Sequence, residues 1–168
     1  MYVWHLVLSS LNKFAVREAS IGRALGVITR CIIVVHFCFV VGFTVCVHAY
    51  AAEIAKGSPI LFDTVRSNYG VDVSSLKTSG NFTCTKPGLY LISATIRSKT
   101  NAAYFAVYKK NTAIVYGYTA EHEKTDTFQH SGTIQCVKSF GQGDVISVKP
   151  WKTIEVNKWS CLTVVMVK

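Results

Sequence analysis

The sequence lacks the motifs that mark several large enzyme classes. It has no G-x-S-x-G nucleophile elbow, no H-E-x-x-H, no Walker phosphate loop and no G-x-G-x-x-G after a strand-like run. A C-x-x-C pair, or a cluster of Cys and His at zinc-binding spacing, is missing as well. We therefore predict no enzymatic activity, no cofactor and no metal site.

Two structural patterns are also missing. No Gly-X-Y repeat occurs, so no collagen stalk is expected. After Ala52, no apolar pattern with a period of 3.6 residues continues over the length of a helix. Because parallel strands need long crossover connections that are usually helical, a parallel α/β sheet is excluded for this part of the chain.

Charge is absent from one long stretch of the sequence. Residues 31–52 contain no Asp, Glu, Lys or Arg, and as a helix they could cross a hydrocarbon layer of roughly 30 Å. Basic residues predominate in residues 1–30, as is typical of a cytoplasmic flank. We expect residues 1–30 to be a basic N-terminal region and residues 31–51 to be a signal peptide h-region or a signal-anchor helix.

The fate of this apolar segment is open at the sequence level. Ala49-Tyr50-Ala51 is an A-x-A pattern that favours cleavage after Ala51 and a secreted protein. The long basic region before the segment favours instead a retained anchor, which would give a type II single-pass membrane protein. Both outcomes place the following residues outside the cell.

The six cysteines are divided equally between the apolar segment and the exported part. If the segment is removed, the cysteines left to form a disulfide are Cys84, Cys136 and Cys161. An odd number permits at most one internal disulfide, of unknown pairing, and leaves a buried thiol or a link between chains.

Short strands with turns between them dominate the exported part. Residues 52–58 form a polar linker and residues 59–168 the expected domain. The clearest strand runs from Leu89 to Arg97, where Tyr90, Ile92 and alternate residues beyond them share one face. Seven or more such runs predict an all-β sandwich or jelly roll.

Several polar side chains are candidate sites. His122 and His130 lie near acidic residues, but a solvated loop is the favoured interpretation of that stretch. Asn81 begins the sequon Asn81-Phe82-Thr83, which predicts a glycosylation site in an exported chain.

Aromatic and basic residues could bind a ligand. The candidate ligand surface consists of Trp151, Trp159, Lys109 and Lys110, with Tyr104, Tyr108, Tyr116 and Tyr118 as further aromatic members. Packing in the core or between subunits is the alternative use of such rings. From Ala52 on, the chain carries 14 Lys and Arg against 8 Asp and Glu, a net charge of +6. Such a surface attracts anionic glycans and lipopolysaccharide, and the alternative is a solvated basic face. No nucleic-acid partner is expected outside the cell.

Three motifs carry a family resemblance. They are Phe62-Asp63-Thr64-Val65, then Ser79-Gly80-Asn81-Phe82-Thr83-Cys84, then Pro87-Gly88-Leu89-Tyr90. In this order the motifs resemble the globular head domain of complement component 1q. Tyr108-Lys109-Lys110-Asn111 and Gly143-Asp144-Val145 are similar to two further motifs of that family.

The chain also departs from the family pattern. Thr112 stands where a Gly is expected, and the closing F-S-G-F is replaced by residues 159–164. Some members bind calcium, but no acidic loop is recognisable here, and neither Glu121 nor Asp126 is assigned as a calcium ligand.

The resemblance implies a jelly roll of about ten antiparallel strands, related to tumour necrosis factor, that assembles as a trimer of itself or of related heads. It favours a secreted, lectin-like recognition module of innate immunity. The alternative is a tumour necrosis factor-like or cerebellin-like signalling ligand for a cell-surface receptor, and an adhesive matrix component is a third class.

Overall fold

A computed structural model describes residues 41–120 and 130–167. The described elements are the strands β1 (Gly42–Cys46), β2 (Ala52–Ile54), β3 (Thr64–Tyr69), β4 (Asn81–Thr83), β5 (Gly88–Ser98), β6 (Tyr104–Lys109), β7 (Thr112–Tyr118), β8 (His130–Phe140), β9 (Val145–Pro150), β10 (Ile154–Val156) and β11 (Cys161–Met166), and the short helix α2 (Ser74–Thr78). Within these residues, no helix has the length and apolar character needed to span a bilayer.

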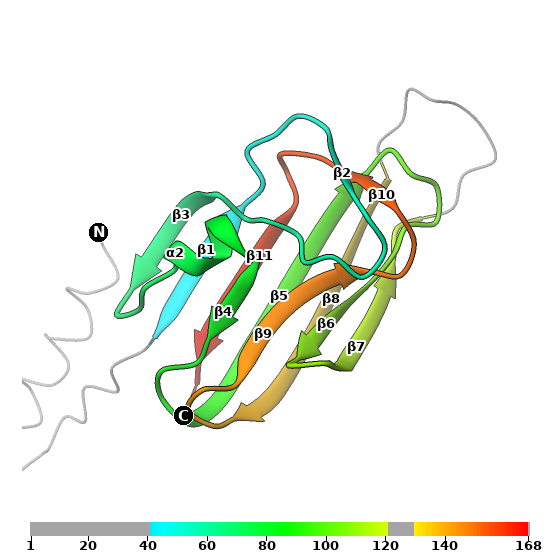
Figure 1. The fold of residues 1–168 in the computed structure, drawn as a ribbon. Coiled ribbons are helices and arrows are strands. Elements are labelled where there is room, and N and C mark those ends of the chain that lie inside the picture. Colours follow the sequence, from blue (N-terminus) through cyan, green and yellow to red (C-terminus); the bar gives the residue numbers. More distant parts are fainter. Residues whose placement is uncertain (1–40, 121–129, 168) are drawn as a thin grey trace, which may run out of the picture. The chain divides into compact units, whose positions relative to one another are not determined.

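The strands form two sheets (Figure 1). The first sheet has the order β2-β10-β5-β11-β1-β3, with β8 paired to β5, and the second has the order β4-β9-β6-β7. Every recorded strand pair is antiparallel. The predicted all-β sandwich is confirmed, and its strand arrangement is consistent with a jelly roll.

The core follows from the alternation of side chains along the strands. In β5, Tyr90, Ile92, Ala94 and Ile96 are fully buried while the residues between them face outward or lie near the surface. The second sheet contributes Phe82, Phe105, Val107, Ile146 and Val148 to the same core. Because successive strand residues point to opposite faces, this apolar period-two pattern fixes which side of each sheet is buried.

The first strand corrects the predicted extent of the apolar segment. Residues 42–46, placed in the targeting helix by sequence, form β1, which pairs with β11 on one side and β3 on the other. Phe43 and Val45 are at most 2% exposed in the core. The sandwich therefore includes residues well before Pro59, where the sequence placed the start of the domain. Residues 31–40 of the predicted helix lie outside the described residues.

The predicted linker is also part of the sandwich. Ala52, Glu53 and Ile54 form β2 and pair with β10 in the first sheet. Beyond β2, the Gly57 amide donates to the Pro150 carbonyl at 2.8 Å and the Ile60 amide to the Val148 carbonyl at 2.9 Å. The segment thus continues along β9 of the second sheet, and its polar sequence reflects exposure rather than lack of structure.

The two sheets approach each other closely where β7 of the second meets β8 of the first. A side chain at Gly132 would collide with the backbone carbonyl of Tyr118, and one at Gly117 would collide with Ile134. Because glycine has no Cβ atom, β7 and β8 can approach more closely at these two positions than other residues would allow. The approach fixes β7, and with it the tyrosines on its outer side, against the rest of the sandwich.

Candidate recognition surfaces

The outer side of the first sheet carries a region without charged side chains. We call it the uncharged face, and its members are Leu89, Leu91, Ser93 and Thr95 of β5, Thr133, Gln135 and Val137 of β8, Thr44 of β1 and Thr163 of β11. Leu91 and Val137 are register partners and are 37% and 55% exposed. Arg97, the next outward residue of β5, ends the face.

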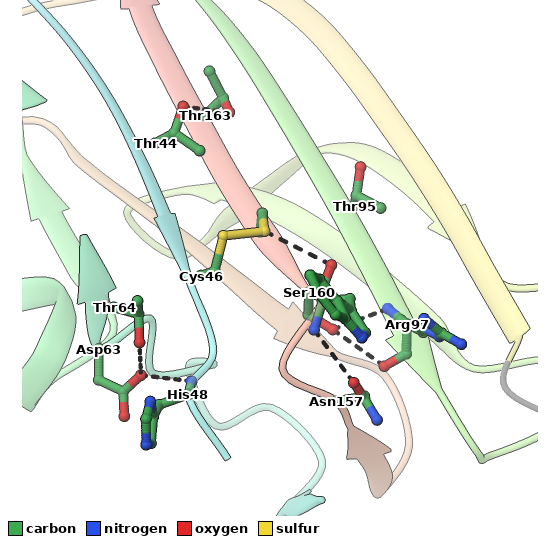
Figure 2. The surroundings of a disulfide bond; sticks show 12 residues. Thr44, Cys46, His48, Asp63, Thr64, Thr95, Arg97, Asn157, Ser160 and Thr163 are labelled. Carbon is green, nitrogen blue, oxygen red and sulfur yellow. Dashed lines mark hydrogen bonds between the residues drawn. A yellow bond between two sulfur atoms is a disulfide. The ribbon is translucent and has the colours of Figure 1, made fainter. Parts of the chain in front are cut away.

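The polar members of the uncharged face are bonded to one another. The hydroxyls of Thr44 and Thr163 lie 3.0 Å apart, and Figure 2 shows this pair across β1 and β11. The hydroxyls of Thr95 and Thr133 lie 2.9 Å apart across β5 and β8. Since these groups are satisfied within the sheet, covering the face requires little loss of hydrogen bonds to water.

The second sheet exposes aromatic rings instead. We call the set of Tyr104, Tyr116, Tyr118 and Trp151 the aromatic face. Their exposed fractions are 52%, 59%, 63% and 50%. The rings of the register partners Tyr104 and Tyr118 have centroids 5.7 Å apart, and those of Tyr116 and Trp151 are 5.4 Å apart, edge to face. The sequence identified these aromatic residues, but only the sheet register brings them together.

A surface depression lies beside the aromatic face. It has a volume of about 270 Å³ and is lined by Lys56, Gly57, Tyr108, Pro150 and Trp151. Its edges come from the segment after β2, from β6 and from the end of β9. Next to it, the Lys149 ammonium sits 5.1 Å from the centroid of the Tyr108 ring, an attractive cation–π arrangement.

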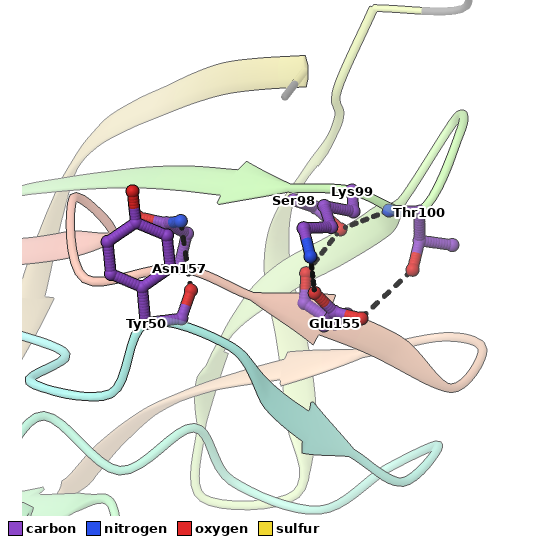
Figure 3. A network of polar contacts seen from close by, with 6 residues as sticks. All are labelled: Tyr50, Ser98, Lys99, Thr100, Glu155 and Asn157. Carbon is purple, nitrogen blue, oxygen red and sulfur yellow. Dashed lines mark hydrogen bonds and ion pairs between the residues drawn. The ribbon is translucent and has the colours of Figure 1, made fainter. Parts of the chain in front are cut away.

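Trp159 belongs to a different cluster from Trp151. The Lys158 ammonium lies 4.6 Å from the Tyr50 ring centroid and 5.4 Å from that of Trp159. Asn157 fixes this cluster, because its side-chain amide donates to the Tyr50 carbonyl at 2.9 Å (Figure 3). The two tryptophans grouped by the sequence analysis are therefore two separate candidate positions.

Lys109 and Lys110 are held by an internal carboxylate. Their ammonium groups lie 2.8 Å and 3.0 Å from the oxygens of Asp144, whose side chain is only 10% exposed. The hydrogen bond from Lys109, the Gly141 amide and the bond from Lys110 lower the pKa of Asp144 well below its usual range. The carboxylate thus ties the β6–β7 turn to the β8–β9 turn, and its single negative charge offsets half of the positive charge of the two lysines.

The disulfide overturns the expected cysteine set. Cys46 and Cys161 are bonded across adjacent positions of β1 and β11, and Figure 2 shows the bond between the strands. Cys84 is buried, which raises the pKa of its thiol to about 12, and burial also raises the pKa of Cys136; both are free thiols. Sequence analysis missed Cys46 because it assigned that residue to the targeting segment.

The strand that carries Cys46 is also where the family match begins. A family model described as "C1q domain" matches residues 42–149. The chain belongs to the C1q domain family. The predicted resemblance is therefore confirmed, and the matched range includes β1.

Solved structures share the fold of this C1q domain. The globular domain of zebrafish complement 1qA has a TM-score of 0.62 at 14% identity, over 76% of this chain and 98% of that one. Eiger TNF from S. frugiperda gives 0.59 at 11% identity, over 77% and 92%, and murine APRIL gives 0.57 at 11% identity, over 76% and 99%. No curated protein sequence matches the chain. At these identities the likeness shows the fold alone.

The remaining predicted residues have mixed outcomes. Asn81 lies on β4, at one end of the order of the second sheet, with Phe82 buried and Thr83 exposed; its glycosylation stays a prediction. His130 begins β8 and is 8% exposed, whereas His122, Glu121 and Asp126 lie outside the described residues. Across the described part of the C1q domain, no group of three or more His, Cys, Asp or Glu could hold a metal ion.

Asp144→Asn is expected to destabilise the C1q domain in a pH-dependent way. The native carboxyl has a lowered pKa, and in the unfolded chain its pKa is about 3.9. The stability from ionised Asp144 is therefore present above about pH 4 and is lost as the pH falls further. We expect the variant to unfold at lower urea concentration than the wild type at pH 7, with a smaller difference at pH 2.5.

Glu53→Gln is the matched control for this experiment, since Glu53 is exposed and forms no ion pair among the described residues. The difference in urea midpoint between the wild type and Asp144→Asn could instead stay constant from pH 7 to pH 2.5. That result would show that the contacts of Lys109 and Lys110 with Asp144 do not stabilise the fold through the charge of the carboxylate.

Proposed function

We propose that this protein is an exported, trimeric recognition module that binds microbial or self ligands bearing anionic glycans, including lipopolysaccharide. The observation that carries the proposal is the difference between the two outer surfaces of the sandwich. One is uncharged and suited to packing against other copies, and the other exposes aromatic rings beside lysines. Membership of the C1q domain family supports a recognition module, and the match points to no enzyme family.

Export is supported by the disulfide. A bond between Cys46 and Cys161 is stable in oxidising compartments and is rare in reduced ones. We propose secretion, with a membrane-anchored form as the alternative. The size and N-terminal sequence of the product purified from medium and from membranes distinguish the two forms.

Assembly is supported by the uncharged face. The exposed apolar side chains of this face are Leu89, Leu91 and Val137, and polar side chains beside them are hydrogen-bonded to one another. An exposed apolar patch of this kind marks an interaction site. Closed rotational symmetry would cover the same patch on every copy. We propose that three copies meet through this face.

Val137→Lys is expected to shift the protein from trimer to monomer at micromolar concentration. The substitution would bring an unpaired ammonium into the covered face, and a buried unpaired charge is costly. Sedimentation velocity measures the result. Leu61→Lys is the control, because Leu61 is 43% exposed on the segment along β9 rather than on the uncharged face. A trimer that persists in Val137→Lys, or a wild-type monomer, would contradict the proposed assembly.

Ligand recognition is tested with the purified full-length protein on an array of cell-wall polymers, lipopolysaccharides and host glycans at two salt concentrations. Binding that falls strongly at high salt is expected, because screening weakens contacts made by exposed lysines. A blank array, combined with saturable and protease-sensitive binding to cells, would favour the signalling-ligand function instead.

A further inference from the structure

We propose that the depression between Trp151 and Tyr108 is a binding site for an acidic saccharide. In this site a sugar ring stacks on the aromatic side chains, and its negatively charged group lies near Lys56 and Lys149. The inference rests on the recognition function proposed above and assigns that function to one place on the second sheet. We name Trp151, Tyr108, Lys56 and Lys149 the saccharide site.

The shape of the site suits a single sugar unit. Its volume of about 270 Å³ lies just below the range of roughly 300 to 1,000 Å³ that holds drug-sized ligands. The Trp151 backbone is fixed, because its amide donates to the Tyr104 carbonyl at 3.0 Å and the preceding Pro150 is buried. The Tyr116 ring packs against Trp151 edge to face, so the indole is supported while half of its surface stays open.

The charges of the site select an anion. Among the described residues, neither Lys56 nor Lys149 has a carboxylate within ion-pair distance. Lys99 and Lys109 differ in this respect, since Lys99 pairs with Glu155 at 3.2 Å and Lys109 with Asp144. Figure 3 draws the Lys99–Glu155 pair. The positive charge at the saccharide site thus has no anionic partner among the described residues, which favours a ligand that carries negative charge.

The charges of Lys56 and Lys149 also make it unfavourable for the saccharide site to be covered by the same surface of a second copy of the protein. A symmetric contact between two aromatic faces would place the same patch on both sides. Lys56 and Lys149 of each copy would then face like charges, and such juxtaposition is unfavourable across an interface. The uncharged face offers a contact between copies without this penalty.

The test measures binding of the full-length protein to a tetramer of α-1,4-linked galacturonate by titration calorimetry. Trp151→Ala is expected to weaken binding about tenfold, the order expected for the loss of one aromatic contact. The double variant Lys56→Gln/Lys149→Gln is expected to weaken binding by a similar factor and to remove most of its salt dependence. A neutral tetramer of galactose should bind at least about tenfold more weakly than the galacturonate.

The chain provides a matched control in its second cluster. Trp159 is 54% exposed and, like Trp151, has a tyrosine and a lysine beside it. Trp159→Ala and Lys158→Gln are therefore expected to bind the galacturonate as the wild type does. Thermal unfolding of every variant checks that the fold is retained.

Four results would overturn the inference. Trp151→Ala could bind as tightly as the wild type, or Trp159→Ala could lose binding equally. Sedimentation could show that Trp151→Ala changes the assembly, which would make the aromatic face an interface between copies. Wild-type protein could fail to bind the galacturonate while it still binds other polymers on the array. In this last case the saccharide site is wrong and the recognition function stands, whereas a blank array contradicts both.

Discussion

A chain that begins at Ala52 is expected not to fold. Such a chain lacks β1, the strand that lies between β11 and β3 in the first sheet. Burial of Phe43 and Val45 contributes about 1.5 to 3 kcal/mol for each side chain, and the lost disulfide adds about 4 to 5 kcal/mol. The sum is comparable to the whole free energy of unfolding of a typical domain, about 5 to 15 kcal/mol.

The comparison is between residues 52–168 and the full-length chain, by circular dichroism and urea unfolding. The shorter chain should show no cooperative transition and should aggregate, because β11 and β3 would expose unpaired edges. A cooperative transition with the wild-type midpoint would show that β1 is dispensable.

The same reasoning bears on processing. Cleavage after Ala51 would cut the chain between β1 and the rest of the sandwich, leaving the disulfide as the covalent link of β1 to the described residues that follow. The A-x-A pattern at residues 49–51 lies between β1 and β2, where Ala49 packs against the core. We therefore expect the exported protein to retain this segment, and its N-terminal sequence to begin before Gly42.

Most of the fold could be predicted because most strands bury only one face. In β5 the buried Tyr90 and Ile92 alternate with the outward Leu91 and Ser93, so the sequence shows a period of two. The Pro87-Gly88 turn before β5 and the Gly141–Gly143 turn before β9 marked where strands begin. The motifs around these turns also carried the family resemblance.

β1 could not be recognised, because its sequence continues an apolar run. Phe43 and Val45 face the core, but Gly42, Thr44 and Cys46 on the other side carry no charge. A short uncharged run of this kind is compatible with both a buried strand and part of a helix. The missing information was the partner strand, β11, which lies more than a hundred residues further along the chain.

The candidate sites depended on tertiary contacts in the same way. Trp151 and Trp159 are close in sequence, yet one packs on Tyr116 and the other lies beside Lys158 and Tyr50. Lys109 and Lys110 suggested a basic patch, but Asp144 from a distant turn offsets half of their positive charge. Residue type identified the candidates, and the strand register decided which of them act together.

The double variant Cys46→Ala/Cys161→Ala is expected to fold with a much lower stability. The bond joins residues separated by 115 positions, and in the chain-entropy account closure of so long a loop stabilises the native state by about 4 to 5 kcal/mol. The corresponding fall in Tm should exceed about 10 °C. Calorimetry of the wild type and the variant, both purified under oxidising conditions, measures the difference.

Cys136→Ala is the control for this prediction, because Cys136 is half-buried and forms no disulfide. Its Tm should change far less than that of the double variant. Reducing agent should lower the Tm of the wild type and of Cys136→Ala toward that of the double variant, and leave the double variant unchanged. Equal Tm values for wild type and double variant would mean that the β1–β11 pairing holds without the bond. The truncation and the disulfide experiments together therefore separate the contribution of the strand from that of its covalent link.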